Sequence, residues 1–324
     1  MKRLFKFLPV LLLIVPVVIF LSGKKPENKI RLLYWNIQMG MWDGQSDNYD
    51  RFVEWVKSKN PDICVWCEGA SLLKTDSDAT APKSERYFPA GWPEVARRYG
   101  HDHVYVGGMR DPFPQIITSR FPIDTMGRFI GTSPDSIVVH GAGWAKVSAG
   151  DKDINIVTLH LQPYSYWRYL PDDQKEESSR NYGGEKYRRM ELEWIFNHTV
   201  RTRENPENEL WMVLGDFNSR SRRDNFYYKW SQASQDFLVH NYIEETEPWL
   251  YDVVAETFPG TFCPSHGKKR IDYVYVSRPL FKAVKNVVTE PDAFSKPKPT
   301  ELKNMKRPSD HYPILVDFNL DRIK

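Results

Sequence analysis

The chain has 324 residues, enough for one large domain or two modest ones, and its formal net charge is +3. The first 23 residues carry three basic side chains and no acidic one, so the rest of the chain has 42 basic and 42 acidic residues. A neutral body argues against a protein that binds nucleic acid mainly through a strongly basic surface. The 11 Trp, 17 Tyr and 17 Phe residues can fill a large core and still line a cleft.

The N-terminal segment, residues 1–23, resembles a signal peptide or an N-terminal membrane anchor. Basic residues precede an apolar run from Phe7 to Leu21, interrupted by two prolines, and small residues follow it. The run is short for a membrane-spanning helix, which needs about 18 residues, but its bulky last residues make a poor cleavage site. Cleavage and anchoring both stay open, and either places the body outside the cytoplasm. We expect residues 24–29 to be a linker and residues 30–322 to form one domain of a monomeric protein.

This domain opens with a strand, a helix and a second strand. A strand-like run extends from Ile30 to Trp35 and an apolar one from Ile63 to Cys67, and the helical spacing of apolar residues over 49–56 predicts a helix between them. A polar residue stands at the end of each strand, Asn36 after the first and Glu68 after the second.

The three cysteines are Cys64, Cys67 and Cys263. Residues three apart in a strand face opposite sides, so Cys64 and Cys67 are badly placed to form a disulfide. We therefore expect buried thiols.

The middle of the chain predicts a proline-rich excursion over 70–98, with a short helix at 93–99, and then a set of short antiparallel strands. The expected strands are Val104–Val106, Gln115–Thr118, Phe129–Ile130, Ile137–His140 and Ala142–Ser148. A longer buried strand, Ile154–Leu159, follows and ends at His160.

An aromatic loop over 164–169 comes next. The remaining expected elements are a helix over 184–203, an irregular stretch over 221–250, strands over 271–276 and 312–318, and a basic, proline-rich loop over 291–308.

The most informative strand is Leu210–Leu214, which is followed by Gly215, Asp216 and Asn218. Residues i and i+2 at a strand end point to the same side, so a carboxylate and an amide would project together from the rim of a sheet. That pair suits a hard divalent cation or a water molecule that must be oriented. A turn closed by the Asp side chain explains the same residues without any function.

Polar residues of this kind stand at the ends of six expected strands. They are Asn36, Glu68, His160, Asp216 with Asn218, Asp272, and Asp310 with His311. Turn formation alone does not account for six such sites, whereas strands that share one rim of their sheets would bring these side chains together.

Six segments resemble, in order, the motifs of the endonuclease/exonuclease/phosphatase superfamily, which includes DNase I-like nucleases, abasic-site endonucleases, neutral sphingomyelinases and inositol-polyphosphate 5-phosphatases. The segments are Trp35–Ile37, Pro61–Glu68, Thr158–His160, Gly215–Asn218, Arg270–Tyr273 and Ser309–Pro313. The resemblance implies an α/β (α+β) four-layer sandwich over residues 30–322. In that fold two mainly antiparallel β-sheets pack face to face, with helices outside and the active site at one rim.

The resemblance also implies a metal-dependent hydrolase of phosphate esters that uses Mg²⁺ or Mn²⁺. The implied metal ligands are Asn36, Glu68 and Asp310, and the implied catalytic residues are His160, Asp216, Asn218, Asp272 and His311. In this scheme His311 is the general base and Asp272 holds its imidazole in the correct tautomer. Asp216 and Asn218 orient the attacking water and a phosphate oxygen, while His160 stabilises the transition state or protonates the leaving group.

The sequence leaves the substrate open. A nuclease is the leading interpretation, because it is the commonest activity of the superfamily. A sphingomyelinase-like phospholipid phosphodiesterase and a small-molecule phosphatase are alternatives, and a non-catalytic surface binding protein is a distant one. Arg220, Tyr164 and Trp167 are candidate substrate contacts, although solvated charges and simple packing explain such residues equally well.

The remaining histidines lack a motif, and we expect them to be surface residues or hydrogen-bonded polar residues. They are His101, His103, His140, His198, His240 and His266.

Overall fold

The computed structural model describes residues 28–38, 49–69, 91–108, 113–129, 137–163, 184–297 and 308–323. The N-terminal segment, the aromatic loop with Tyr164 and Trp167, and most of the basic loop at 291–308 lie outside this part of the chain. Within the described part, no helix has the length and apolar character needed to cross a membrane.

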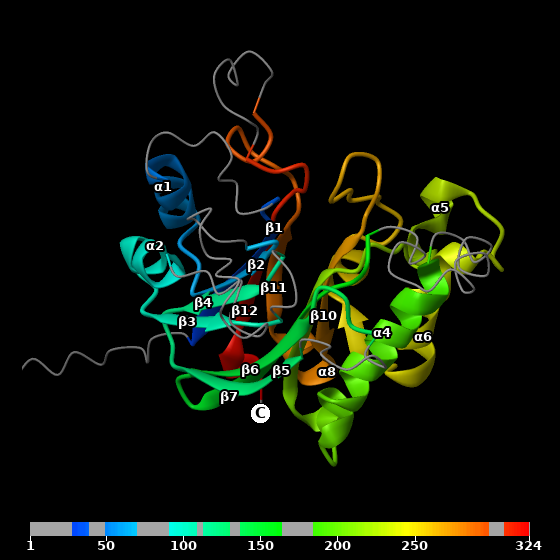
Figure 1. Ribbon diagram of the computed structural model, residues 1–324, viewed down its shortest axis with the longest axis horizontal. Helices are drawn as coiled ribbons and strands as arrows, with labels where there is room; N and C mark the ends of the chain where they lie inside the picture. The colour runs from blue at the N-terminus through cyan, green and yellow to red at the C-terminus, as the bar shows by residue number, and fades with distance from the viewer. Residues whose placement is uncertain are drawn as a thin grey trace, which may run out of the picture.

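Two six-stranded sheets form the centre of the molecule (Figure 1). Across the first sheet the strands are β11 (Val284–Val288), β12 (Ile314–Asn319), β1 (Lys29–Asn36), β2 (Ile63–Cys67), β4 (Ile116–Ser119) and β3 (His103–Val106). Across the second they are β5 (Ile123–Phe129), β6 (Ala142–Ala149), β7 (Lys152–His160), β8 (Leu210–Asp216), β10 (Asp272–Ser277) and β9 (Leu250–Asp252).

Each sheet has one parallel pair at its centre. β1 runs parallel to β2 in the first sheet and β7 runs parallel to β8 in the second, while every other neighbouring pair is antiparallel. Both sheets are therefore mainly antiparallel, as the sequence predicted, and they repeat the same order of strand directions.

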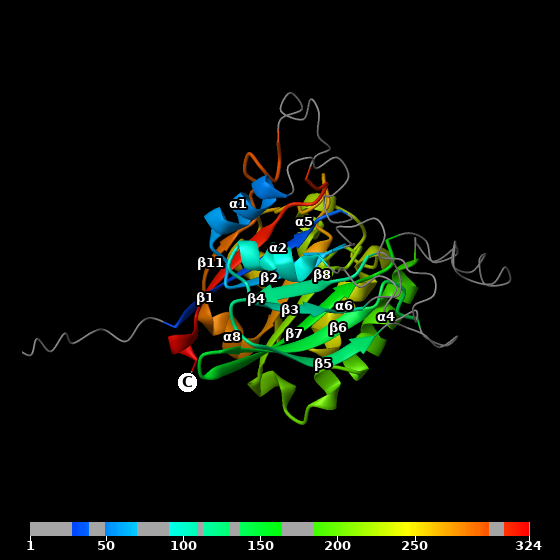
Figure 2. The same ribbon diagram turned by 60° about the vertical axis from the view of Figure 1, so that its left-hand side comes forward.

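Helices cover the outer face of each sheet (Figures 1 and 2). On the first sheet lie α1 (Asp50–Lys59) and α2 (Trp92–Arg98), and on the second lie α4 (Glu185–Asn197) and α6 (Leu238–Thr246). Shorter helices are α5 (Asn225–Tyr228), α7 (Val253–Thr257) and α8 (Arg278–Ala283), with 3₁₀ turns at Val200–Thr202, Pro206–Asn208, Arg222–Asp224, Gln235–Phe237 and Leu320–Arg322. The expected four-layer sandwich is confirmed.

Strand alternation explains how the layers form. In β1, Leu32 and Tyr34 join the core between the sheets, whereas Leu33 and Trp35 join the core under α1 and α2. Because β1 is buried on both faces, most of its residues are apolar, and this strand could therefore be predicted from the sequence.

The same alternation places the two neighbouring cysteines. Cys67 lies in the core between the sheets and Cys64 lies in the core under the helices. Both are buried free thiols, and Cys263 is a free thiol of intermediate exposure. The predicted absence of a Cys64–Cys67 disulfide is confirmed.

Several expected elements were wrong or incomplete. Residues 137–140 are not a strand, because the Val139 N–H donates to the Glu191 carboxylate instead of to a neighbouring strand. Of the strand expected at 129–130, Phe129 is the last residue of the longer β5, whose mostly exposed residues give little hydrophobic signal, and residue 130 lies outside the described residues. Residues 221–250, expected to be irregular, contain α5 and α6. The helix expected over 184–203 ends at Asn197.

Candidate active site

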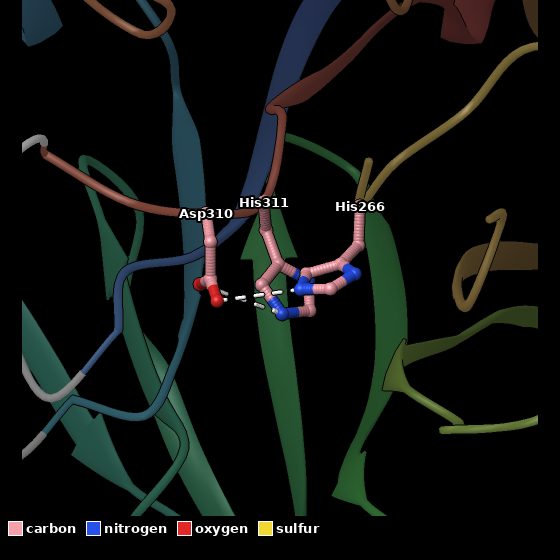
Figure 3. A group of neighbouring side chains, drawn as sticks. All are labelled: His266, Asp310 and His311. Atoms are coloured by element: carbon pink, nitrogen blue, oxygen red, sulfur yellow. Dashed lines mark hydrogen bonds and ion pairs between the residues drawn. The ribbon is translucent and has the colours of Figure 1, made fainter. Parts of the chain in front are cut away.

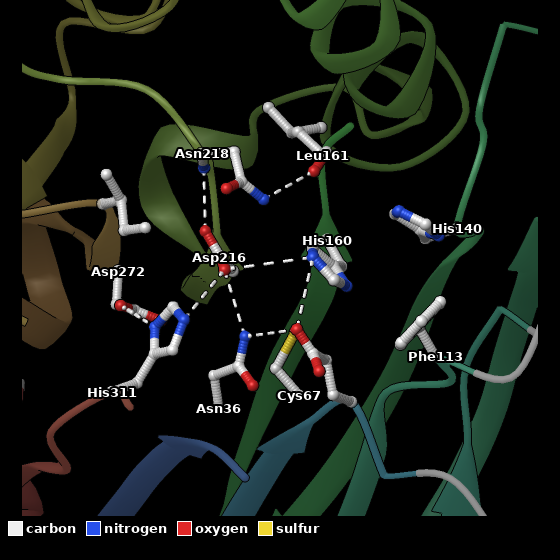
Figure 4. A network of polar contacts seen from close by, with 12 residues as sticks. Asn36, Cys67, Phe113, His140, His160, Leu161, Asp216, Asn218, Asp272 and His311 are labelled. Carbon is white, nitrogen blue, oxygen red and sulfur yellow. Dashed lines mark hydrogen bonds and ion pairs between the residues drawn. The ribbon is translucent and has the colours of Figure 1, made fainter. Parts of the chain in front are cut away.

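The strand ends bring the predicted residues together at one rim of the sandwich (Figure 4). Asn36 ends β1 and Glu68 follows β2 directly, while His160 ends β7 and Asp216 ends β8. The parallel register pairs His160 with Asp216, and the antiparallel register pairs Asp272, the first residue of β10, with the same Asp216.

An amide links the acids of the two sheets. The Asn36 Nδ2 group donates to Glu68 Oε1 at 3.1 Å and to Asp216 Oδ2 at 3.0 Å. Asp216 is only 2% exposed. Burial, and next the nearby charge of Asp272, raises the pKa of Asp216 well above its usual range. Asp216 therefore takes up a proton more readily than an exposed carboxylate does.

Asn218 ends a turn closed by the Asp216 side chain, and one oxygen of the same carboxylate still faces the site. The Asn218 backbone N–H donates to Asp216 Oδ1 at 2.8 Å, so the Asp side chain does close a turn. The other carboxylate oxygen, Oδ2, remains directed at Asn36 and the histidines. The Asn218 amide donates to the Leu161 carbonyl at 2.9 Å, which fixes it beside the strand that carries His160.

His311 is oriented by a carboxylate from the opposite sheet. Its Nδ1 lies 2.7 Å from Asp272 Oδ2, and the Tyr34 hydroxyl donates to Asp272 Oδ1 at 2.6 Å. Its Nε2 points toward Asp216 Oδ2 at 3.8 Å (Figure 4). Burial lowers the pKa of His311, but the carboxylates of Asp272, Asp216 and Asp310 outweigh it and raise this pKa to about 10.

His160 faces the same carboxylates from the other side. Its Nε2 lies 4.0 Å from Glu68 Oε1 and 3.9 Å from Asp216 Oδ2. The imidazole of His140 stacks on it with ring centroids 4.5 Å apart. Burial, and next the neighbouring His140 and His311, lowers the pKa of His160 well below its usual range. His160 is therefore a neutral imidazole at physiological pH.

Asp310 has a histidine partner that the sequence did not identify (Figure 3). The Nε2 of His266 lies 3.3 Å from Asp310 Oδ2, and the His266 and His311 rings have centroids 4.7 Å apart. A backbone bridge between His266 and His311 holds the two segments together. Although burial opposes it, the His266 hydrogen bond and the charge of His311 lower the pKa of Asp310.

The donor set suits a hard divalent cation. The site gathers the four carboxylates of Glu68, Asp216, Asp272 and Asp310 with the imidazoles of His160, His266 and His311. Clustered oxygen donors of this kind, with imidazoles beside them, are typical of sites for divalent cations such as Mg²⁺ and Mn²⁺. Among the described residues, the potential ligands form three overlapping groups: Glu68 with His160 and Asp216, Asp216 with Asp272 and His311, and His266 with Asp310 and His311.

The predicted ligands thus divide between these groups. Glu68 and Asp310 do not share one, and Asn36 turns its amide nitrogen rather than its oxygen toward the carboxylates. The ligand set Asn36, Glu68 and Asp310 stays a prediction, and it requires the Asn36 amide to rotate.

Two of the histidines without a motif lie against catalytic candidates, although no sequence pattern assigned them a role: His266 is a hydrogen-bonded polar residue, as expected, and its partner is Asp310, while the ring of His140 stacks on His160. Of the predicted substrate contacts, Arg220 lies with its guanidinium 5.3 Å from the Trp230 ring centre and 3.7 Å from Asp236. Tyr164 and Trp167 lie outside the described residues.

The fold and this rim of acids and histidines define a DNase I-like phosphoesterase. The sequence profile of the Endonuclease/Exonuclease/phosphatase family matches residues 33–311. The chain belongs to this family and is a hydrolase of ester bonds, and enzymes of the family generally depend on a divalent metal ion. A search of curated proteins finds no match.

Solved structures share the fold at low sequence identity. An AP endonuclease from Archaeoglobus fulgidus has a TM-score of 0.58 and 16% identity, over 90% of this chain and 99% of that one. An endonuclease/exonuclease/phosphatase from Beutenbergia cavernae has a TM-score of 0.57 and 17% identity, over 90% of this chain and 72% of that one. The human Nocturnin catalytic domain has a TM-score of 0.54 and 15% identity, over 90% and 93%.

Proposed function

We propose that this enzyme is a divalent-metal-dependent phosphodiesterase of the endonuclease type. The observation that carries the proposal is the pair of imidazoles directed at one buried carboxylate. The Nε2 atoms of His311 and His160 lie 3.8 Å and 3.9 Å from Asp216 Oδ2, and each histidine comes from a different sheet. Two imidazoles with opposite pKa shifts are suited to accept one proton and to donate another.

In this mechanism His311 is the general base. Asp272 fixes the Nδ1 proton, so Nε2 is the nitrogen that takes a proton from the attacking water. Although burial opposes them, the carboxylates of Asp272, Asp216 and Asp310 raise the pKa of His311 to about 10. A cation held by the neighbouring carboxylates would offset their charge and lower this pKa, which would leave Nε2 free to accept the proton. Asp216 and Asn218 orient the water and a phosphate oxygen, and neutral His160 donates a hydrogen bond to the developing charge.

Glu68, Asn36 and Asp310 are the residues that we expect to hold the cation, which would be Mg²⁺ or Mn²⁺. When bound, such an ion stabilises the charge that develops on the phosphate oxygens.

The test is hydrolysis of bis-p-nitrophenyl phosphate by the full chain. We expect turnover with Mg²⁺ or Mn²⁺, no turnover with EDTA, and a loss of at least about a hundredfold in His311→Ala and Glu68→Gln. The matched control is His198→Ala, because His198 is exposed and its ring contacts Trp194 of α4 and Phe129 of β5 rather than a residue of the site. Turnover that is unchanged by EDTA and by His311→Ala would contradict the mechanism.

A phospholipid phosphodiesterase is the second candidate, favoured by exposed rings close to the site. Phe226 is 46% exposed, Tyr227 42% and Trp230 37%. The Tyr228 hydroxyl accepts the backbone N–H of Arg270, which lies two residues before Asp272, and so connects this segment to the site. Aromatic side chains favour membrane interfaces. Cleavage of sphingomyelin vesicles without cleavage of DNA would select this candidate, and salt-sensitive DNA cleavage would select the nuclease.

We further propose that residues 1–23 export the enzyme or anchor it to a membrane, and that it acts as a monomer. Fractionation of cells that express the full chain tests the first point, and light scattering of the purified protein tests the second. Recovery in the cytosol, or a mass of twice the chain, would contradict them.

A further inference from the structure

The orientation of His160 poses a problem that its hydrogen bonds do not solve. His311 is fixed through Nδ1 by Asp272, but the Nδ1 atom of His160 is buried and has no hydrogen-bond partner among the residues that the structure describes. A catalytic imidazole is normally oriented by a hydrogen bond to its second nitrogen. Something else must therefore hold the His160 ring with Nε2 toward the site.

Aromatic packing on the far side of the ring supplies that support. Figure 4 shows His160 between Asp216 and His140. The His140 ring is nearly parallel to it, with an interplanar angle of 26° and a centroid distance of 4.5 Å. The Phe113 ring meets both imidazoles edge-on, at 5.1 Å from His140 and 6.2 Å from His160. His140 and His160 are 3% and 2% exposed, so both rings have little room to turn.

His140 is in turn fixed through its backbone. Glu191, on α4, accepts the N–H of Val139 through Oε1 at 2.9 Å and the N–H of Gln162 through Oε2 at 3.1 Å. One fully buried carboxylate thus joins the segment before His140 to the segment after His160. The Gln115 amide also donates to the His140 carbonyl at 3.3 Å.

We propose that His140 and Glu191 are positioning residues for the reaction: the stacked His140 ring sets the orientation of His160, and the Glu191 carboxylate holds the two histidine-bearing segments in register. This inference rests on the proposed function, in which His160 acts on the phosphate. His140 itself lies behind His160 and is not a catalytic residue. Burial of His160 next to His140 lowers the pKa of His160, which agrees with a neutral donor.

A matched pair of substitutions tests the stack. His140→Phe keeps a flat ring, and His140→Leu fills similar volume without one, while both remove the ring nitrogens. With bis-p-nitrophenyl phosphate and Mg²⁺, we expect His140→Leu to lower kcat about tenfold to a hundredfold with KM changed less than about threefold. We expect His140→Phe to stay within about threefold of the unchanged enzyme. Glu191→Gln, which loses one of two acceptors, should lower kcat in the same direction.

A second measurement does not depend on turnover. In ¹⁵N-histidine NMR spectra, the His160 ring signals should broaden or shift in His140→Leu and stay close to their original positions in His140→Phe and in the control His198→Ala. Equal kcat values for the Leu and Phe variants, with unchanged His160 signals, would overturn the proposal. An inactive wild-type enzyme whose His160 signals respond as expected would contradict the proposed function but support the positioning role.

Discussion

Replacing Arg270 by methionine tests what holds the second sheet's half of the site in place. Arg270 is 1% exposed, and its guanidinium donates through Nε to Asp224 and through Nη1 to Asp252, each at 2.7 Å. The guanidinium also lies 4.4 Å from the ring centre of Tyr273, next to Asp272 on β10. Methionine keeps an unbranched apolar stem but leaves two buried carboxylates without a cation.

The expected loss of stability follows from the two hydrogen bonds of the Arg270 guanidinium. A hydrogen bond to a charged group contributes about 1.5–3 kcal/mol, and breaking a buried ion pair from one side costs about 3–5 kcal/mol. We expect R270M to lower the free energy of unfolding by about 3–5 kcal/mol, a large part of the roughly 5–15 kcal/mol of a typical domain. Adding Asp224→Asn and Asp252→Asn removes the stranded charges and should restore part of the loss.

Urea unfolding at pH 7, followed by tryptophan fluorescence, measures these changes. Arg203→Met is the matched control, because Arg203 pairs with Glu209 at 2.9 Å while its side chain is 47% exposed. An exposed pair contributes less than about 1 kcal/mol. If R270M costs no more than this control, the buried network does not stabilise the fold in the way its geometry indicates.

Three further measurements address other buried groups. Burial raises the pKa of Glu191 from 4.5 to about 7, so the folded state keeps a proton that the unfolded state loses. Stability should then fall by roughly 3 kcal/mol as the pH rises through that window, and an equal fall in Glu191→Gln would contradict this. Gly215→Ala places a Cβ 1.9 Å from a carbonyl oxygen of β7. In the urea assay we expect the free energy of unfolding to fall by more than about 2 kcal/mol, and a fall of less than about 1 kcal/mol would contradict this close approach. Ellman's reagent should label only Cys263 in the native protein, because Cys64 and Cys67 are buried with raised thiol pKa values, and rapid labelling of all three would refute that burial.

Much of the architecture could be predicted from the sequence because the central strands are buried on both faces. β1, β2, β7 and β8 are rich in apolar residues, and each is followed or closed by a polar residue that the structure places at the rim. Peripheral elements gave weaker signals. β5 is largely exposed, and β11 is interrupted by a bulge between Val284 and Asn286, so neither shows a clean alternation.

The two histidines that were missed depend on contacts between distant segments. His266 lies next to Asp310 and His311 because a backbone bridge joins it to His311, 45 positions later in the sequence. No local sequence pattern predicts this contact. Residues 137–140 look like a strand because Ile137, Val138 and Val139 are β-branched, yet the Val139 N–H is taken by a helix carboxylate. Because Glu191 accepts the N–H groups of Val139 and Gln162 in place of a neighbouring strand, it also brings His140 next to His160. Predicting the position of either histidine would have required knowing which distant segments of the chain contact each other.

Strand direction explains why residues from six segments meet. In each sheet the central parallel strands end at the rim, and the antiparallel neighbour begins there. The first sheet thus contributes Asn36 and Glu68 from strand ends, and Asp310 with His311 from the approach to β12. The second contributes His160 and Asp216 from strand ends and Asp272 from the start of β10.

The bonds that complete the site run between the sheets rather than within them. Asn36 of the first sheet donates to Asp216 of the second, and His311 of the first pairs with Asp272 of the second. Neither sheet alone holds both partners of either pair, so both bonds form only when the two sheets pack together. The proposed mechanism therefore requires the core between the sheets to be packed, and substitutions in that core should reduce kcat through the geometry of these two bonds even where they are far from the rim.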